Sequence, residues 1–514
     1  MAITTMNNND VKVRSKTAYI HTFLFAIYPV IGLYSINMKE LVPGVIVVPL
    51  AVYLAAAVLL VAGFGFWYDY PEKGALMASA VFLTSTVLGQ GIELVDRSIV
   101  GTYLLDEYNW VWVVFILALL YGLSRQVRKI QDVHKMTRAA NVTAAALILF
   151  PLVSIGSFYR NNAKLFEQPQ KPATLTSAAL SSNRLPDIYY IILDGYARQD
   201  VLAEMYGYDN GPFVEDLKRL GFIVLPRART NYSFTTQSLA SSLNMRYIDE
   251  LNKAPNQEVE SLRLIRENRI MTEMKTNGYQ VIQFSSGWTV TGQVMPEADI
   301  NFNCRSLNQY TVMLARTSVL RFFMGQPFYV ASQRDILSYN LSKLKDIPRM
   351  PKRKFVFLHL VCPHPPFVFD RMGRLPDRNK AMRKLEADWL PKERYVDQLH
   401  YLNGKVMEAV RQIIQLSPTP PVIVIQGDHG PATDKLKALP TPETSKMRTS
   451  ILNAYYLPGK GRELLYPTIT PVNTFRLILN AYLGGKWPFL KDKTYYFGPI
   501  GGSPYTFIDV TNYP

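Results

Sequence analysis

Residues 422–430 read VIVIQGDHG, and this stretch decides the fold and the position of the site. Four apolar residues, all of them β-branched, predict a buried strand, and the glycines around Asp428 and His429 predict a sharp turn after it. A second apolar run, residues 188–193 (IYYIIL), ends in the same way at Asp194. Open α/β sheets bind ligands outside the carboxyl ends of their strands. Two strands that each end in a carboxylate therefore predict one metal centre at that edge of a sheet.

The chain from Pro186 onward alternates short β-rich runs with helical runs. This alternation predicts an α/β domain with a mainly parallel sheet and helices on both faces. The predicted strands are residues 188–193, 222–225, 280–284, 355–360 and 422–425, and the predicted helices are residues 213–220, 259–277 and 394–416.

The first 160 residues are of a different kind, because five apolar stretches follow one another there. These stretches are residues 17–36, 42–67, 75–95, 110–123 and 142–158. A helix needs about 20 apolar residues to span a bilayer, and tryptophan near the ends of such stretches is typical of membrane interfaces. We therefore predict an α-helical transmembrane domain with five spans over residues 1–160. Buried helices of a water-soluble protein are the less favoured alternative.

Basic residues in the short connections predict the orientation of these spans. The connection between the fourth and fifth spans carries Arg125, Arg128 and Lys129, whereas residues 96–109 carry one arginine and three acids. The positive-inside rule then places the N-terminus and the basic connection in the cytoplasm. An odd number of spans places the rest of the chain outside, so we expect a multi-pass protein of the inner cell membrane. Residues 161–185, rich in Pro, Ala, Ser, Thr and Lys, predict a linker to an extracytoplasmic catalytic domain over residues 186–514.

Composition narrows the class of partner. The net charge is +16 and 48% of the residues are hydrophobic, but no basic arm or nucleic-acid motif is present. A membrane protein that acts on anionic lipids or phosphates explains this charge better than nucleic acid does. The two cysteines, Cys304 and Cys362, establish no redox compartment, and a disulfide between them is the less favoured reading because Cys362 lies next to a predicted site strand.

Two further motifs carry groups that can do chemistry. Residues 358–367 (LHLVCPHPPF) place His359 and His364 at and just beyond a strand end. Residues 232–244 (YSFTTQSLASSLN) are dense in hydroxyl groups. Such a stretch is usually a helix cap or a polar face. It also presents a nucleophile at a helix N-terminus in some enzymes, because the backbone N–H groups there stabilise an anion.

In the order of the chain, the four motifs are the acid after the first strand, the hydroxyl-rich stretch, the paired histidines and the Asp-His pair. In this order they resemble the alkaline phosphatase superfamily, and within it the sulfatase-like membrane branch of phosphoethanolamine transferases, lipoteichoic acid synthases and phosphoglycerol transferases. The resemblance extends over residues 186–496. It implies one divalent metal ion held by Asp194, Thr235, Asp428 and His429. Two carboxylates and an imidazole suit zinc or manganese better than magnesium.

The same resemblance assigns roles at the reacting centre. Thr235 would be the nucleophile, with Ser238 completing the Thr-x-x-Ser pattern, and Thr236 stays open as the alternative. One of His359 and His364 would bind the substrate phosphate or protonate the leaving group.

Other residues of this region bear on substrate binding and on the type of reaction. Arg198, Asn231 and Ser238 are weaker candidates for substrate binding, since packing is the commoner role for each alone. Arylsulfatase chemistry is disfavoured, because the sequence after Thr235 lacks the proline and arginine of the formylglycine motif. Asp194 stands where the transferases mostly have glutamate and where sulfatases and phosphodiesterases have aspartate.

Together, the resemblance and the anchor predict a membrane-anchored phosphotransferase. It would move phosphoethanolamine or phosphoglycerol from a phospholipid donor to an envelope glycan or lipid acceptor through a phospho-threonine intermediate. The alternatives are a sulfatase-like hydrolase or metal-dependent phosphodiesterase, and a catalytically inactive envelope scaffold. The oligomeric state stays open.

Overall fold

The computed structural model describes residues 18–96, 109–163, 185–254, 256–288, 290–304, 308–322, 326–376, 389–432, 439–498 and 506–513. The chain divides into two compact units, which are described separately. The first comprises residues 1–38, 42–159 and 316–322, and the second comprises residues 39–41, 160–315 and 323–514. Most of the predicted linker at residues 161–185 lies outside the described residues.

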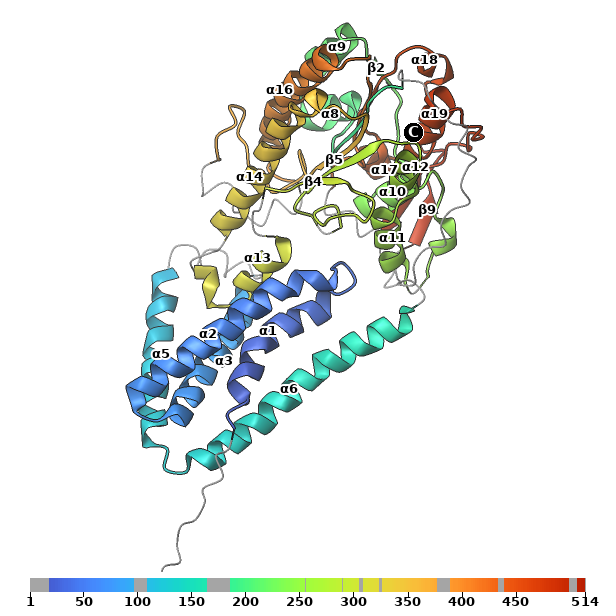
Figure 1. Ribbon diagram of the computed structural model, residues 1–514. Helices are drawn as coiled ribbons and strands as arrows, with labels where there is room; N and C mark the ends of the chain where they lie inside the picture. Colours follow the sequence, from blue (N-terminus) through green and yellow to red (C-terminus); the bar gives the residue numbers. More distant parts are fainter. Residues whose placement is uncertain are drawn as a thin grey trace, which may run out of the picture. The chain divides into compact units, whose positions relative to one another are not determined.

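The first unit is built from long apolar helices (Figure 1). They are α1 (His21–Asn37), the short 3₁₀ helix η1 (Pro43–Ile46), α2 (Val47–Tyr68), α3 (Pro71–Asp96), α5 (Asn109–Lys129) and α6 (Val133–Asn161). Each of the five predicted apolar stretches is a helix. Within the described residues, four of them are long and apolar enough to cross a membrane. The fifth, α1, has 17 residues, at the lower end of the range of about 17–25 for a span.

The outer surface of this helical unit is apolar. Phe66 on α2 and Phe150 on α6 are 86% and 80% exposed. In water, exposed apolar area is unfavourable by about 25 cal/mol per Å², so a surface of this kind requires lipid around it. Inside the unit, some polar groups pair with one another: the His21 Nδ1 atom lies 2.6 Å from the Ser79 hydroxyl, and the Tyr34 and Tyr159 hydroxyls lie 2.5 Å apart. The chain is therefore an integral membrane protein.

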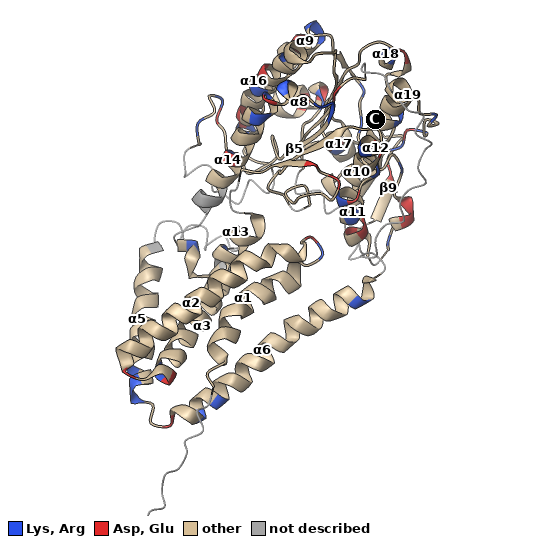
Figure 2. Cartoon of the chain, in the orientation of Figure 1, with Lys and Arg blue, Asp and Glu red and all other residues tan. Residues whose placement is uncertain are grey.

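Positive charge gathers where α5 ends and α6 begins (Figure 2). The last turn of α5 contains Arg128 and Lys129. The Lys73 ammonium joins them, since it donates a 2.8 Å hydrogen bond to the Arg128 carbonyl. This is the basic connection on which the predicted orientation depends.

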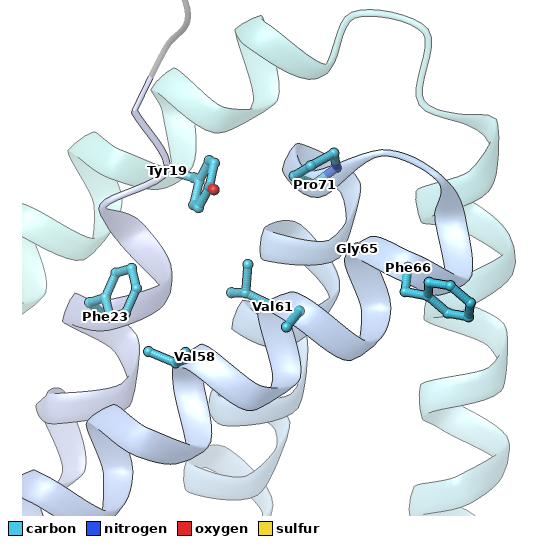
Figure 3. A pocket seen from close by; sticks show the side chains of 8 residues that line it. Tyr19, Phe23, Val58, Val61, Gly65, Phe66 and Pro71 are labelled. Atoms are coloured by element: carbon cyan, nitrogen blue, oxygen red, sulfur yellow. The ribbon is translucent and has the colours of Figure 1, made fainter.

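A cavity of about 500 Å³ lies between α1 and α2 in the helical unit (Figure 3). Its lining is apolar apart from one tyrosine: Tyr19, Phe23, Val58, Val61, Ala62, Gly65, Phe66 and Pro71. Such a lining offers no metal ligand and no activated nucleophile. The groups that can hold a metal or attack a substrate lie in the second unit.

The second unit contains a seven-stranded sheet with the strand order β2-β7-β6-β1-β5-β3-β4. Its strands are β1 (Ile188–Leu193), β2 (Ile223–Val224), β3 (Gln280–Phe284), β4 (Ile300–Phe302), β5 (Lys354–Leu360), β6 (Val422–Gln426) and β7 (Asn453–Tyr456). β1 pairs in parallel with β5 and β6, and β3 pairs in parallel with β4 and β5. Only β7 runs against its neighbours, β2 and β6. The predicted mainly parallel sheet is confirmed.

The central strand β1 is buried on both faces, as parallel sheets require. Tyr189, Ile191 and Leu193 belong to one apolar core, and the alternating residues Ile188, Tyr190 and Ile192 belong to the other.

Helices cover both faces of the sheet (Figure 1). The first core is covered by α8 (Gln199–Tyr206), α9 (Gly211–Arg219), α14 (Gln326–Leu344) and α16 (Lys392–Leu416). The second is covered by α10 (Thr235–Ser242), α11 (Gln257–Arg266), α12 (Arg269–Thr276) and α19 (Pro471–Tyr482). The remaining described helices and strands of this unit are η2 (Asp249–Leu251), α13 (Gln309–Arg316), η4 (Ile347–Arg349), α17 (Pro442–Thr449), α18 (Gly461–Leu464) and the hairpin β8 (Tyr495–Gly498) and β9 (Thr506–Asp509).

One predicted helix is wrong in extent. Residues 259–277 form two helices, α11 and α12, rather than one. The Asn268 side chain starts the second helix, because its Oδ1 atom accepts a 2.9 Å hydrogen bond from the Met271 backbone N–H. Asparagine is favoured at this N-cap position, and the apolar periodicity on either side hides the break.

Candidate active site

The four residues predicted to hold a metal meet around one ring nitrogen, Nε2 of His429. This atom lies 3.0 Å from the Thr235 hydroxyl, 3.5 Å from Oδ1 of Asp194 and 3.4 Å from Oδ2 of Asp428. The other ring nitrogen, Nδ1, lies 2.9 Å from the Gly430 carbonyl oxygen. A carbonyl oxygen only accepts, so Nδ1 carries the proton and Nε2 has a free lone pair. A carbonyl that accepts from the second ring nitrogen is the usual support of a metal-ligating histidine, because it fixes the orientation of the ring.

His359 adds a fifth donor to this cluster. Its Nε2 atom lies 3.4 Å from the second Asp194 oxygen, Oδ2, and its Nδ1 atom lies 2.8 Å from the Thr291 hydroxyl. One ligand atom from each of Asp194, His359 and Asp428 falls within 4.8 Å of the others, and all three residues are buried. His359 is thus among the possible metal ligands, whereas the resemblance implied that either His359 or His364 binds the substrate phosphate or protonates the leaving group.

The donor atoms fit a cation. Asp194 Oδ1, His359 Nε2 and Asp428 Oδ2 are buried, and none of them has a hydrogen-bond partner among the described residues. Buried polar atoms are nearly always paired, and each one left unpaired costs about 1–3 kcal/mol or more. Three such atoms in one cluster of carboxylates and imidazoles indicate a bound divalent ion, and this set of oxygen and nitrogen donors suits zinc or manganese.

The electrostatics of the cluster lead to the same conclusion. Burial acts to raise the pKa of the Asp194 carboxyl, but the imidazoles of His364, His359 and His429 outweigh it and hold that pKa well below its usual range. Burial, and then the Asp194 charge, raise the pKa of Asp428 to about 7. Two carboxylates this close resist being ionised together, and a divalent cation removes that resistance.

The His429 imidazole is held neutral. Burial, and then the nearby positive charge of Arg448, lower the pKa of His429 well below its usual value. A neutral imidazole is the form that binds metal.

Glycines let the backbone deliver these side chains. Gly195 follows Asp194 with φ +75°, a conformation that favours glycine, and its N–H donates a 3.0 Å hydrogen bond to Asp428 Oδ1. A Cβ atom on Gly195 would collide with the ring of Trp389, and one on Gly430 would collide with the Met447 carbonyl oxygen. The turns after β1 and β6 can therefore carry only glycine at these positions.

Thr235 is the first residue of α10, and the following turn is tied to the metal cluster. The Ser238 hydroxyl lies 3.1 Å from the Thr230 hydroxyl, which donates a 2.6 Å hydrogen bond to the Asp428 backbone carbonyl. Ser238 therefore helps to set the distance between α10 and the turn that carries Asp428. Thr236, the neighbouring hydroxyl, is half-buried and makes no hydrogen bond to the cluster among the described residues.

Two of the weaker candidates are occupied elsewhere. All three guanidinium nitrogens of Arg198 are used, on the Asp200 carboxylate and the Ala228 carbonyl. The Asn231 side chain is buried, and its Oδ1 accepts from the Val472 N–H while its Nδ2 donates to the Thr470 hydroxyl and the Lys493 carbonyl. These contacts fix loops around the site.

His364 has one ring nitrogen available. Its Nδ1 atom lies 2.6 Å from the Pro365 carbonyl, so this nitrogen carries a proton, and its backbone N–H donates to the Asp194 carbonyl at 3.0 Å. The ring packs against Trp389, with 4.7 Å between centroids, and lies 6.3 Å from the His429 ring. Nε2 has no partner among the described residues, which leaves it free for substrate.

Two residues of this site escaped the sequence reasoning. Trp389 is buried and covers Gly195 and His364. Arg448 is buried on α17, and it donates 2.6 Å hydrogen bonds to the Ser233 and Gly430 carbonyls. Neither lies in a motif, and the contacts of Arg448 are to backbone atoms, which have no sequence signature.

A mainly parallel α/β sheet with a hydroxyl, two carboxylates and histidines beside the carboxyl ends of its central strands is an arrangement that can hold a divalent ion in an enzyme site. The sequence model of the sulfatase family ("Sulfatase") matches residues 186–475, more than half of the chain. The chain belongs to the sulfatase family, a family of enzymes within the alkaline phosphatase superfamily.

Solved structures with a similar fold were also found. The C-terminal periplasmic domain of EcEptC from Escherichia coli, in complex with zinc, has 14% identity and a TM-score of 0.43, covering 64% of this chain and 94% of that one. The integral membrane lipooligosaccharide phosphoethanolamine transferase A (EptA) from Neisseria meningitidis has 11% identity and a TM-score of 0.39, covering 90% and 95%. The phosphonate monoester hydrolase of Agrobacterium radiobacter has 12% identity and a TM-score of 0.38, covering 61% and 80%. No curated protein matches the sequence.

Proposed function

We propose that this protein is a membrane-anchored phosphotransferase that moves a phospholipid head group, phosphoethanolamine or phosphoglycerol, to a hydroxyl of an envelope glycan or lipid. The observation that carries the proposal is the meeting of Thr235 Oγ1, Asp194 and Asp428 at the Nε2 atom of His429, in a chain that also has membrane-spanning helices.

A divalent ion, zinc or manganese, would be held by Asp194, Thr235, Asp428 and His429, with His359 beside them. When bound, the ion would supply the Lewis acidity that lowers the pKa of the Thr235 hydroxyl and offsets the charge of the phosphate.

The protein's own groups would then carry the reaction. Thr235 attacks phosphorus as the alkoxide, after its hydroxyl proton has left to solvent; the bond from phosphorus to the diacylglycerol oxygen breaks, and the doubly protonated His364 gives that oxygen the proton of Nε2. In the second half, His364 Nε2 takes the proton of the acceptor hydroxyl, whose oxygen attacks phosphorus, and the bond from phosphorus to Thr235 breaks to return the Thr235 alkoxide. His364 suits this work because it is only half-buried and Nε2 has no other partner, whereas His359 is fully buried.

The anchor supports a lipid donor over a soluble substrate. Membrane attachment confines enzyme and lipid to the same surface, which raises the effective concentration of the donor. The threonine supports phosphate over sulfate chemistry, since threonine cannot be converted to formylglycine.

We expect a covalent intermediate on Thr235. The metal-loaded enzyme, mixed with phosphatidylethanolamine or phosphatidylglycerol and without an acceptor, should accumulate the corresponding head-group phosphate on the peptide that contains Thr235. Mass spectrometry of the digested protein measures it, and the lipid that gives the adduct identifies the donor. Addition of acceptor should remove the adduct. Absence of an adduct with both lipids, together with cleavage of an aryl sulfate, would contradict phosphotransfer.

A hydrolase, with water as the acceptor, is the second candidate, because Asp194 is the residue that the sulfatases and phosphodiesterases have at this position. In the same experiment, a hydrolase would release free head-group phosphate at an unchanged rate whether or not an acceptor is present.

We also expect residues 186–514 to lie outside the cytoplasm. A reporter that is active only in the cytoplasm should be silent when fused after Pro514, because five spans, α1 included, would follow a cytoplasmic N-terminus. The same reporter inserted at residues 130–132, between α5 and α6, is the control and should be active. Activity of the Pro514 fusion would overturn the topology.

A further inference from the structure

Arg448 differs in its hydrogen bonding from the other buried arginine of the described chain. Arg448 and Arg476 are 3% and 8% exposed. Arg476 uses all three nitrogens on backbone carbonyls: Nε and Nη2 donate to Met245, and Nη1 donates to Pro488. Arg448 uses only two, since Nε donates to Ser233 and Nη1 donates to Gly430. Among the described residues, Nη2 of Arg448 has no partner.

The Arg448 guanidinium lies between two loops of the candidate active site. Ser233 comes two residues before Thr235, and Gly430 comes directly after His429. The guanidinium also lies over the Phe234 ring, 4.8 Å from its centroid. Arg448 therefore bridges the loop of the nucleophile and the loop of the metal ligand.

A second unpaired group belongs to the same neighbourhood. The Tyr496 hydroxyl is buried and has no hydrogen-bond partner among the described residues. The residues on either side of Tyr496 both bond to Ser233: the Ser233 N–H donates to the Tyr495 carbonyl at 3.1 Å, and the Phe497 N–H donates to the Ser233 hydroxyl at 2.8 Å. Ser233 is also the residue whose carbonyl accepts from Arg448. Burial raises the pKa of Tyr496, and the positive charge of Arg448 opposes that rise. The Arg448 Nη2 atom therefore has unused hydrogen-bonding capacity, and the Tyr496 hydroxyl is a buried group whose lack of a partner is costly without a ligand.

We propose that Arg448 and Tyr496 form an anion subsite that binds the non-bridging oxygens of the phosphate being transferred. This deepens the proposed function and rests on it. The planar guanidinium is suited to phosphate, because its N–H groups point in fixed directions. Two carbonyls hold the side chain in place before substrate arrives, so its Nη2 is preorganised toward an anion that the protein itself does not contain.

The test is the affinity of the zinc-loaded, full-length enzyme in detergent for inorganic phosphate, measured by isothermal titration calorimetry, together with its zinc content. Arg448→Met should weaken phosphate binding at least about tenfold, the scale of one charge-assisted hydrogen bond, and Tyr496→Phe should weaken it several-fold. Both variants should keep the zinc content of the unsubstituted enzyme. Arg448→Lys, which keeps the charge, should recover part of the affinity. Arg476→Met, a buried arginine elsewhere, is the matched control and should bind phosphate normally.

The outcomes separate this inference from the proposed function. If the unsubstituted enzyme binds no phosphate when zinc is present, the proposed function fails. If it binds phosphate and Arg448→Met and Tyr496→Phe bind equally well, the anion subsite is wrong and the proposed function stands. If Arg448→Met loses zinc and phosphate together while Tyr496→Phe binds both normally, Arg448 only positions the two loops, and the subsite is again wrong. Should Arg448→Met fail to fold, Arg448→Lys and Tyr496→Phe decide.

Discussion

Replacement of Thr235 by alanine is expected to lower turnover by roughly 10⁴-fold or more, the scale on which loss of a catalytic nucleophile acts. The substitution removes the oxygen that would attack phosphorus and that lies 3.0 Å from Nε2 of His429. It removes little else, because one neutral hydrogen bond contributes only about 0.5–1.5 kcal/mol to folding. Initial rates of head-group transfer, with thermal unfolding of the same sample, measure both quantities.

Thr236→Ala is the matched control for Thr235→Ala. It deletes the same atoms one residue later, on a half-buried side chain, and should keep most of the activity. An inactive Thr236→Ala beside an active Thr235→Ala would show that the nucleophile is Thr236. Near-normal activity in both variants would exclude a threonine nucleophile in this turn.

The Asp428→Ala, His429→Ala double variant is expected to lose its metal and, with it, all measurable activity. Changes to groups that merely support a ligand already cost about 10–100-fold in metal affinity, so the loss of two ligands should cost more. Elemental analysis after gel filtration in metal-free buffer measures the occupancy. Full occupancy of the double variant would reject this ligand set.

A control for the metal variant exists on α16. The double variant Asp397→Ala, His400→Ala removes the same two residue types from the face of α16 that is turned away from the core. There, Asp397 pairs with Arg371 and His400 is exposed. This second double variant should keep both metal and activity, which would show that the first effect comes from the position of the residues and not from their removal as such.

The sequence is most informative where a strand leads directly into a chemical group. The parallel strands β1 and β6 are adjacent, so Asp194 and the Asp428–His429 pair meet at one edge as soon as both are recognised as strands. Thr235 joins them because α10 begins close to that edge. In each case a short local pattern determines the position of the side chain, and the resemblance adds the roles.

What the sequence did not predict depends on contacts between distant segments. Arg448 reaches backbone carbonyls of residues 233 and 430, and any residue type provides such a carbonyl. The antiparallel strand β7 has only four residues, too few to show a period. The break between α11 and α12 depends on one asparagine cap within an otherwise continuous apolar pattern.

The shared contact at His429 Nε2 also constrains how this enzyme evolves. Three groups from three separate segments depend on one atom, so the benefit of each depends on the presence of the others. Any one change can abolish the activity, after which the remaining changes are nearly neutral and accumulate freely. Reversal would then need several substitutions at once, none of them useful alone. Loss of catalysis through any one of these substitutions should therefore be effectively irreversible.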